Sequence, residues 1–430
     1  MFVKNKVVNN AKWIIICKIV QSLLQFVIGM FCARYLGPSN YGLINYASSI
    51  VAFALPIMQL GLQATLVQEL TEKPEKAGKI MGTSLVMDLV SSVFCILLVG
   101  AFVSVANFGD WETIIVCMLY SISLVFRAFE LLQCWFQYKL KSKIPSIVML
   151  FAYLAVSLYR IFLLVTSKNI FWFAVVNSID YGIVGISLVV IYNRIAEYRL
   201  SFSPQLIKEL FIRSKYYILA SMMIILFQNT DQIMLKLICS DGDTQNGFYT
   251  AAITCATVMQ FVFVAIVDSM RPVILSCKKS GSSDYDTNMI RLYCITNYMG
   301  LIQAVGFTVF ASLVVKILFG ADYTSSVPVL RILAWYIVFS YMGSVRNVWI
   351  LAEGKQSLLW KINLCGAVMN IIINACLIPF CGAIGAAIAS LFTQIFTNLI
   401  LGFIVKPLRE NNRMLLKGMN PKLLLDLVKK

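Results

Sequence analysis

Residues 80–106 read IMGTSLVMDLVSSVFCILLVGAFVSVA and contain a single charged residue, Asp88. A helix needs about 20 apolar residues to cross the hydrocarbon of a bilayer. This stretch is therefore long enough to span a membrane. Eleven further stretches of the same kind occur along the chain, at roughly 13–33, 43–64, 112–134, 146–166, 171–191, 215–237, 248–270, 292–314, 329–351, 358–378 and 383–405.

The composition agrees with this pattern. Of the 430 residues, 60% are apolar and 13% are charged, and the mean hydropathy is +0.81. A soluble domain is about 45–50% apolar and about 25% charged. These values exclude a soluble enzyme, a nucleic-acid-binding domain and a disordered chain. The sequence predicts an all-α integral membrane protein with twelve transmembrane helices.

The basic residues predict the orientation in the membrane. Lysine and arginine number 27 in the two termini and the loops on their side, and 5 in the alternate loops. Because positively charged loops stay in the cytoplasm, we expect a multi-pass protein of the cell inner (cytoplasmic) membrane with both termini cytoplasmic. The net charge of +16 is then mostly an orientation signal.

The spans divide into two halves of six. Thirty residues separate Lys12 from Gly42, and thirty-two separate Lys215 from Gly247, near the start of the second half. An even number of spans in each half predicts two parallel repeats around a central cavity, as in alternating-access transporters. We expect a lobe at 1–200, a linker at 201–213, a lobe at 214–405 and a basic cytoplasmic tail at 406–430. That tail is either an amphipathic helix on the anionic leaflet or a solvated segment.

Several kinds of chemistry are absent from the sequence. The twelve cysteines are scattered through apolar runs without a C-x-x-C pair, which is typical of small buried hydrophobic residues. There is no histidine and no G-x-x-x-x-G-K-[ST] motif. We expect no metal, no cofactor and no catalytic residue. A transport function would need an ion gradient, a substrate gradient or a partner to drive it.

Charged residues within membrane spans usually face a cavity. We therefore predict a cationic substrate-binding cavity lined by basic residues and one amide: Lys18, Arg127, Arg160, Arg346 and Gln25. Arg127 and Glu130 are three residues apart on one helical face. They form either a self-neutralised pair or a gate at which a pyrophosphate competes with Glu130 for the guanidinium.

Carboxylates within the spans are candidates for gating or for coupling to protons or sodium: Asp88, Glu130, Asp180 and Asp231. A buried carboxylate can change its protonation state during a transport cycle. The alternative is that each one is a structural partner for an intramembrane arginine or lysine. Asp231 lies in the polar run Gln228–Gln232, which predicts a broken or water-facing helix.

Several segments resemble a known family. They are ARYLGPSNYG at 33–42, NTDQIML at 229–235, GFYTAA at 247–252 and PFCGAIGAAIA at 379–389. The chain is similar to polysaccharide repeat-unit flippases (Wzx-type, O-antigen and capsule) of the multidrug/oligosaccharidyl-lipid/polysaccharide superfamily. The acidic outer loop Asp241-Gly242-Asp243 departs from the Gly-containing turn that relatives often have there.

The resemblance implies a carrier that moves undecaprenyl-pyrophosphate-linked oligosaccharide from the inner to the outer leaflet. It also implies membrane lipids, a glycan polymerase and chain-length machinery as partners, and no nucleic acid. A drug/cation antiporter of the same superfamily is an alternative, and a lipid II flippase, a family that often has extra spans, is another. A membrane glycan polymerase or ligase would need a larger outer loop than this chain offers.

Overall fold

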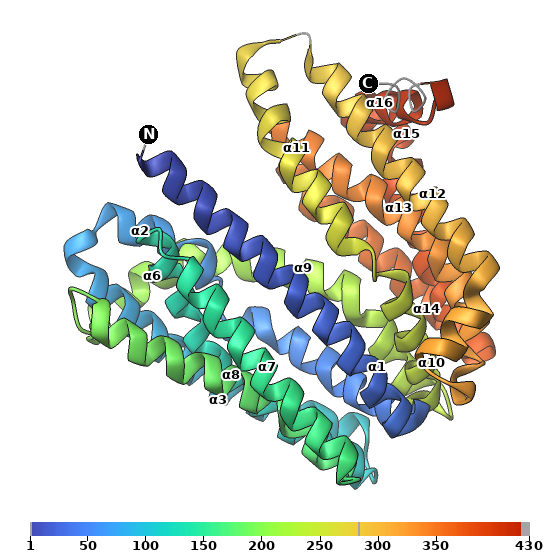
Figure 1. Ribbon diagram of the computed structural model, residues 1–430, viewed down its shortest axis with the longest axis horizontal. Coiled ribbons are helices and arrows are strands. Elements are labelled where there is room, and N and C mark those ends of the chain that lie inside the picture. Colours follow the sequence, from blue (N-terminus) through green and yellow to red (C-terminus); the bar gives the residue numbers. More distant parts are fainter. Residues whose placement is uncertain (1, 283, 423–430) are drawn as a thin grey trace. The chain divides into compact units, whose positions relative to one another are not determined.

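The structure is a computed structural model that describes residues 2–282 and 284–422, and among residues 2–18 the only side chain described is that of Cys17. All regular structure in these ranges is helical (Figure 1). The α-helices are α1 (Phe2–Met58), α2 (Leu66–Glu72), α3 (Ala77–Ala106), α4 (Trp111–Ser121), α5 (Ser123–Arg127), α6 (Leu132–Tyr138), α7 (Lys143–Val165), α8 (Ile170–Ile195), α9 (Pro204–Ile238), α10 (Gly242–Ala256), α11 (Gln260–Ser280), α12 (Asp284–Leu318), α13 (Ser326–Ala352), α14 (Ser357–Ile395), α15 (Leu401–Ile404) and α16 (Arg409–Gly418). The short elements are the 3₁₀ turns η1 (Leu62–Ala64), η2 (Pro74–Lys76), η3 (Ala128–Leu131), η4 (Ala321–Tyr323) and η6 (Lys406–Leu408), and the π-helix η5 (Phe396–Ile400).

The prediction of twelve spans is confirmed. Ten helical segments of the described chain are long and apolar enough to cross a membrane. Two of them, Ile19–Met58 and Ser357–Ile404, have 40 and 48 residues. At 1.5 Å per residue these would measure about 60 and 72 Å, about twice the thickness of the hydrocarbon layer. Each therefore contains two spans, and the ten segments hold twelve.

A single glycine divides each of the two long segments. Gly37 has φ 70° and ψ 172°, and Gly382 has φ 51° and ψ −129°. Both have the positive φ that glycine adopts without a steric penalty. Pro38 follows Gly37 and occupies the first turn of the next helix, where its missing N–H costs nothing. The chain thus passes from one span to the next with almost no loop.

The chain forms two compact units. The first comprises Met1–Leu36 and Leu43–Asn229, and the second comprises Gly37–Gly42 and Thr230–Lys430. The boundary between Asn229 and Thr230 lies inside α9. This helix begins at Pro204, so most of the predicted linker at 201–213 belongs to the same helix as the seventh span. The lobe boundaries at 200 and 214 stay a prediction.

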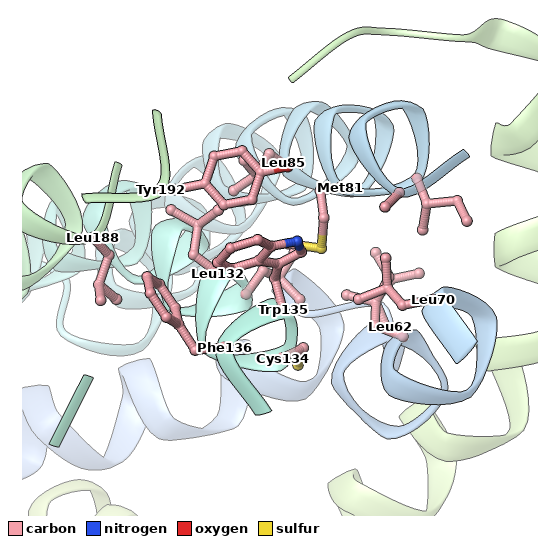
Figure 2. Close-up of a cluster of buried hydrophobic side chains, with 14 of the residues drawn as sticks. Leu62, Leu70, Met81, Leu85, Leu132, Cys134, Trp135, Phe136, Leu188 and Tyr192 are labelled. Atoms are coloured by element: carbon pink, nitrogen blue, oxygen red, sulfur yellow. The ribbon is translucent and has the colours of Figure 1, made fainter. Parts of the chain in front are cut away.

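The first unit has a hydrophobic core around Trp135 (Figure 2). Trp135 is 2% exposed, and its ring contacts Phe136 and Tyr192 edge-on at centroid distances of 5.1 and 4.8 Å. Met81 and Leu132 are also buried in this cluster. Edge-to-face aromatic pairs add about 0.5–1.5 kcal/mol to the burial of their area. The core therefore joins α3, α6 and α8.

Ion pairs attach α2 to the start of α9. Nη1 of Arg213 lies 2.6 Å from Oε1 of Glu69 and 2.9 Å from Oε2 of Glu72. Glu69 is 2% exposed, so the pair is shielded on one side. Hydrogen bonds from Gln68 and Arg213 lower the pKa of Glu72. The short helix α2, between the second and third spans, is thereby held against the start of α9, the helix that continues into the second unit.

The basic tail forms a helix that packs on the second unit. In α16, Asn411, Met414 and Leu415 are buried. The hydroxyl of Tyr293 on α12 donates to Oδ1 of Asn411 at 2.6 Å, and the hydroxyl of Tyr298 donates to the carbonyl of Met419 at 2.9 Å. The described part of the tail is thus an amphipathic helix whose apolar face contacts protein. Residues 423–430 lie outside the described residues.

The repeated glycines Gly42 and Gly247 mark a close backbone contact within the second unit. A Cβ on Gly42 would lie 1.8 Å from the carbonyl oxygen of Asp243, and a Cβ on Gly247 would lie 2.0 Å from that of Pro38. Nδ2 of Asn246 donates to the carbonyl of Gly42 at 2.8 Å. Segments 38–42 and 243–247 therefore cross where only glycine fits.

We expect Gly42→Ala to destabilise the protein by about 1–3 kcal/mol, because the added methyl group overlaps the backbone of Asp243. The check is the midpoint of thermal unfolding of the purified protein in detergent. Gly306→Ala is the matched control, since a Cβ on Gly306 meets nothing within 4 Å. Equal midpoints for the two variants would contradict the crossing.

Candidate functional site

Arg127 and Glu130 lie where the fourth span is interrupted. Arg127 ends α5, and the 3₁₀ turn η3 begins at the next residue. The tighter turn still places both side chains on one face, with Nε of Arg127 3.5 Å from Oε2 of Glu130. The two side chains are 21% and 16% exposed. This is a long single contact, so the pair holds the guanidinium only weakly.

Tyrosine side chains contact Arg127 and Arg160, the two intramembrane arginines of the first unit. The guanidinium carbon of Arg127 lies 4.5 Å from the ring centroid of Tyr181 on α8. On α7, Nη1 of Arg160 donates to the hydroxyl of Tyr153 at 3.2 Å. A cation over an aromatic face is attracted without using its N–H donors. Most donors of the two guanidinium groups therefore make no hydrogen bond to the described residues.

A further tyrosine and a carboxylate connect these groups. Tyr120 on α4 accepts a hydrogen bond from Nδ2 of Asn177 and interacts electrostatically with Arg127 and Arg160. Asp180 on α8 interacts electrostatically with Arg160 and Glu130. Four residues predicted from the sequence thus share one cluster in the first unit, which we call the arginine–tyrosine cluster: Arg127, Glu130, Arg160 and Asp180, with Tyr120, Tyr153, Asn177 and Tyr181.

The other predicted cavity residues lie elsewhere. The side chain of Lys18 is outside the described residues. Gln25 is exposed on α1. Arg346 belongs to the second unit and is 5% exposed. The arginine–tyrosine cluster holds two arginines, Arg127 and Arg160, and two carboxyl groups, those of Glu130 and Asp180. Its charge is therefore balanced rather than purely cationic.

Arg346 binds the π-helix of the last span. Its Nη1 donates to the carbonyl of Thr397 and to Oδ1 of Asn398, both at 2.8 Å. A π-helix shifts the backbone hydrogen-bond register and leaves carbonyl groups available. A Cβ on Gly343, one turn before Arg346, would lie 2.5 Å from Oδ1 of Asn398. Arg346 therefore fastens α13 to η5.

Asp231 is surrounded by hydrogen-bond donors. The carboxylate is 6% exposed, and its Oδ1 accepts from Nδ2 of Asn370 at 3.0 Å and from Nδ2 of Asn374 at 2.6 Å. Its Oδ2 accepts from the hydroxyls of Tyr249 at 2.7 Å and Ser390 at 2.5 Å. Four donors thus surround one carboxylate, in a site that has no lysine or arginine partner among the described residues. We call this group the Asp231 cluster.

The partners of Asp231 were not predicted from the sequence. Asn370 and Asn374 occupy one face of α14 at a spacing of four, and Ser390 lies on the same helix beyond the bend at Gly382. Two amides one turn apart in an apolar helix are a signal that sequence reasoning can use, because they need a polar partner. Nothing in the spacing indicates which carboxylate provides it.

Asp88 has the opposite environment. It is 1% exposed on α3, and neither of its carboxylate oxygens has a hydrogen-bond partner among the described residues. The side chain is thus neither paired with an intramembrane arginine nor part of the arginine–tyrosine cluster.

Comparison with protein families identifies the chain. The family described as "Polysaccharide biosynthesis protein" matches residues 7–278, more than half of the sequence. The chain belongs to this family. It is 22% identical over 405 residues to the capsular polysaccharide biosynthesis protein CapF of Staphylococcus aureus, covering 90% of this chain and 96% of CapF. An uncharacterized membrane protein of Methanocaldococcus jannaschii, MJ1068, is 24% identical over 51% of this chain, and the chain spans only 45% of that relative.

Solved structures share the fold. The lipid II flippase MurJ in an inward closed conformation matches with a TM-score of 0.71 at 14% identity, over 96% of this chain and 92% of MurJ. An inward-facing MATE family transporter of the MOP superfamily matches with a TM-score of 0.66 at 13% identity, over 91% and 96% of the two chains. The polysaccharide biosynthesis protein described here is therefore a multi-pass membrane protein with the fold of MOP superfamily transporters.

Replacement of Asp231 by leucine should destabilise the second unit strongly. The change removes the shared acceptor of four buried donors. Nδ2 of Asn374 keeps Oδ1 of Asn370 at 3.0 Å and the hydroxyls of Tyr249 and Ser390 keep each other at 3.2 Å, but the amide of Asn370 loses its acceptor outright, and a buried group without a partner costs about 1–3 kcal/mol. We expect a lower midpoint of thermal unfolding in detergent. Asp268→Leu serves as the control, since Asp268 is 54% exposed beside Arg271 and its loss should leave the midpoint near that of the wild type. A similar decrease in both variants would argue against the Asp231 cluster.

Proposed function

We propose that this protein is a flippase for undecaprenyl-pyrophosphate-linked oligosaccharide repeat units. It moves them from the inner to the outer leaflet of the cytoplasmic membrane by alternating access, with both termini in the cytoplasm, and it performs no covalent catalysis. Membership of the polysaccharide biosynthesis family supports a saccharide cargo. The shared fold with MurJ, a lipid II flippase, supports a lipid-linked saccharide.

The proposal rests on Arg127 and Arg160, the two arginines of the arginine–tyrosine cluster, and on the small number of hydrogen bonds that they make. Arg127 and Arg160 are held by tyrosine rings, and most of their N–H groups are free of bonds to the described residues. A planar guanidinium offers two parallel N–H groups to phosphate oxygens. The long contact of Arg127 with Glu130 is weak enough for a pyrophosphate to displace the carboxylate. Glu130 then acts as a gate that occupies Arg127 when no substrate is bound.

The tyrosines of the cluster suit the sugar part of the cargo. Tyr120, Tyr153 and Tyr181 offer hydroxyl groups for hydrogen bonds and ring faces for stacking. The polyprenyl chain has no need of this polar cluster, because it is soluble in the surrounding lipid. Through its place in the same synthesis, the protein acts together with a glycan polymerase and chain-length machinery. These partners, like the substrate, belong to the proposal.

The Asp231 cluster is our proposed ion-coupling site. Its oxygen atoms include Oδ1 of Asn374, which makes no hydrogen bond in the described part of the chain. Hard monovalent cations prefer carboxylate, amide and hydroxyl oxygens, and rotation of the amides would present such oxygens. The described residues contain no group of three or more His, Cys, Asp or Glu side chains that could hold a metal. The donor set therefore fits a proton or a sodium ion better than a transition metal.

A drug/cation antiporter is the second candidate. The carboxylates Glu130 and Asp180 near tyrosine rings also suit an organic cation, which such rings attract. Deletion of the gene separates the two functions. A flippase mutant accumulates labelled lipid-linked oligosaccharide in the inner leaflet, whereas an antiporter mutant becomes sensitive to cationic drugs. Accumulation of unpolymerised units in the outer leaflet would indicate a polymerase or ligase instead.

Arg127→Ala and Arg127→Glu should abolish translocation while the protein level stays normal, because the pyrophosphate loses its guanidinium ligand. The measurement is complementation of a deletion strain, with protein quantified by immunoblot and labelled lipid-linked oligosaccharide located by leaflet. Arg271→Ala is a matched control, since Arg271 is 46% exposed and pairs with Asp268 on the surface. Transport by Arg127→Ala at the wild-type rate would remove this residue from the mechanism.

Asp231→Asn should abolish the stimulation of transport by an imposed ion gradient, since the amide cannot balance the charge of a bound cation. Reconstituted vesicles with either a sodium or a proton gradient test this and identify the ion. Asp268→Asn, which changes an exposed carboxylate, should retain the full response. A wild-type response in Asp231→Asn vesicles would refute coupling at Asp231.

A further inference from the structure

A polar stripe runs along the buried face of α3. Ser84, Asp88 and Cys95 follow one another at spacings of four and seven, so they lie on one side of the helix, and all three are buried. The opposite side carries exposed apolar residues, among them Val90 and Leu97. The carboxylate of Asp88 therefore faces protein rather than lipid.

Within this stripe Cys95 donates to the carbonyl of Ala54, but Ser84 and Asp88 are unsatisfied among the described residues. Both oxygens of Asp88, Oγ of Ser84 and Oγ of Ser123 on the neighbouring α5 have no hydrogen-bond partner in the described ranges. Nearly all buried polar side-chain atoms in proteins have a partner. A buried polar atom without a hydrogen-bond partner therefore indicates that the group binds a ligand or has a function of its own.

The charges around Asp88 offer no compensation. The titratable groups that interact electrostatically with it are the thiols of Cys95 on its own helix and Cys134 on α6. Arg127 on α5 and Glu130 on η3, two of the elements packed against α3, pair with each other. The other elements that pack against α3 are α2, η2 and α4, and their charged residues are Glu69, Glu72, Glu75, Lys76 and Glu112. None of these described side chains supplies a cation or a donor to Asp88. A carboxylate ion without a donor or a cation is costly to bury, whereas the neutral acid is tolerated.

We propose that Asp88 is a proton-binding site of the first unit, separate from the Asp231 cluster. In this conformation Asp88 is a neutral carboxylic acid. During the transport cycle its O–H bond breaks when water reaches the side chain, and the proton passes to that water, which becomes a hydronium ion. A carboxylate remains until a hydronium ion on the other side returns a proton to it and is released as water. Ser84 and Ser123 supply hydroxyl groups that can hydrogen-bond the charged form.

The two buried aspartates are thus complementary. Asp231 has four donors and no described cationic partner, which suits a carboxylate ion that receives a cation. Asp88 has no donor, which suits an acid that releases a proton. Contrasting environments of this kind distinguish the roles of paired carboxyl groups in other proteins. The transport role of Asp88 rests on the proposed flippase function, whereas its bound proton does not.

Infrared spectroscopy of the purified protein in nanodiscs tests the bound proton directly. At neutral pH we expect a C=O stretching band of a protonated carboxylic acid that is lost in Asp88→Asn and retained in Asp231→Asn. Asp88→Glu should keep an acid band at a shifted position, which preserves the test if Asp88→Asn fails to fold. Absence of the band from the wild type, or its persistence in Asp88→Asn, would overturn the assignment.

A transport measurement tests the release of the proton. Asparagine resembles the neutral acid in shape, so Asp88→Asn should keep the wild-type unfolding midpoint and lose the dependence of transport on a proton gradient. A wild-type response to that gradient would show that Asp88 is a static buried acid and overturn its role in the cycle. If the protein transports no lipid-linked oligosaccharide, the infrared result still decides whether Asp88 holds a proton.

Discussion

Hydrocarbon cannot hydrogen-bond, so every polar group that this chain places among its membrane spans must find its partner within the protein. The requirement accounts first for the backbone. Helices satisfy their own N–H and C=O groups, and all regular structure of the described residues is helical. Where spans join, Gly37 and Gly382 turn the chain at single residues. Such turns expose very little unpaired backbone.

The same requirement organises the side chains, and the two units meet it differently. In the first unit, tyrosine rings support two arginines whose donors remain largely unused. In the second unit, four donors surround Asp231, and Nη1 of Arg346 donates to the carbonyl of Thr397 and to Oδ1 of Asn398. Under the proposed function, the first arrangement binds an anionic substrate and the second binds a small cation. Asp88 departs from this requirement, since both of its carboxylate oxygens lack a hydrogen-bond partner among the described residues.

Much of this architecture could be predicted from the sequence. The length of each apolar stretch predicts a span, because about 20 helical residues match the thickness of the hydrocarbon layer regardless of how the helices pack. The grouping of Arg127, Glu130, Arg160 and Asp180 could not be predicted, since it depends on how four helical segments pack. Arg346 shows the limit most clearly. The position of Arg346 within a span predicts a side chain that faces a cavity. Its guanidinium instead donates to a backbone carbonyl of the π-helix η5, and no side-chain pattern in the sequence indicates that partner.

The helix α9 has a mechanical consequence. It belongs to the first unit up to Asn229 and to the second from Thr230, without a loop between them. Its first turns are fastened to α2 through Arg213, and its later part is fastened to α10 and α14 through Asp231. The polar side chains of 228–232 lie where this helix passes from one unit to the other. One continuous helix thus takes part in the packing of both units, and a bend in α9 would act on the ion pairs of Arg213 and on the hydrogen bonds of Asp231 together.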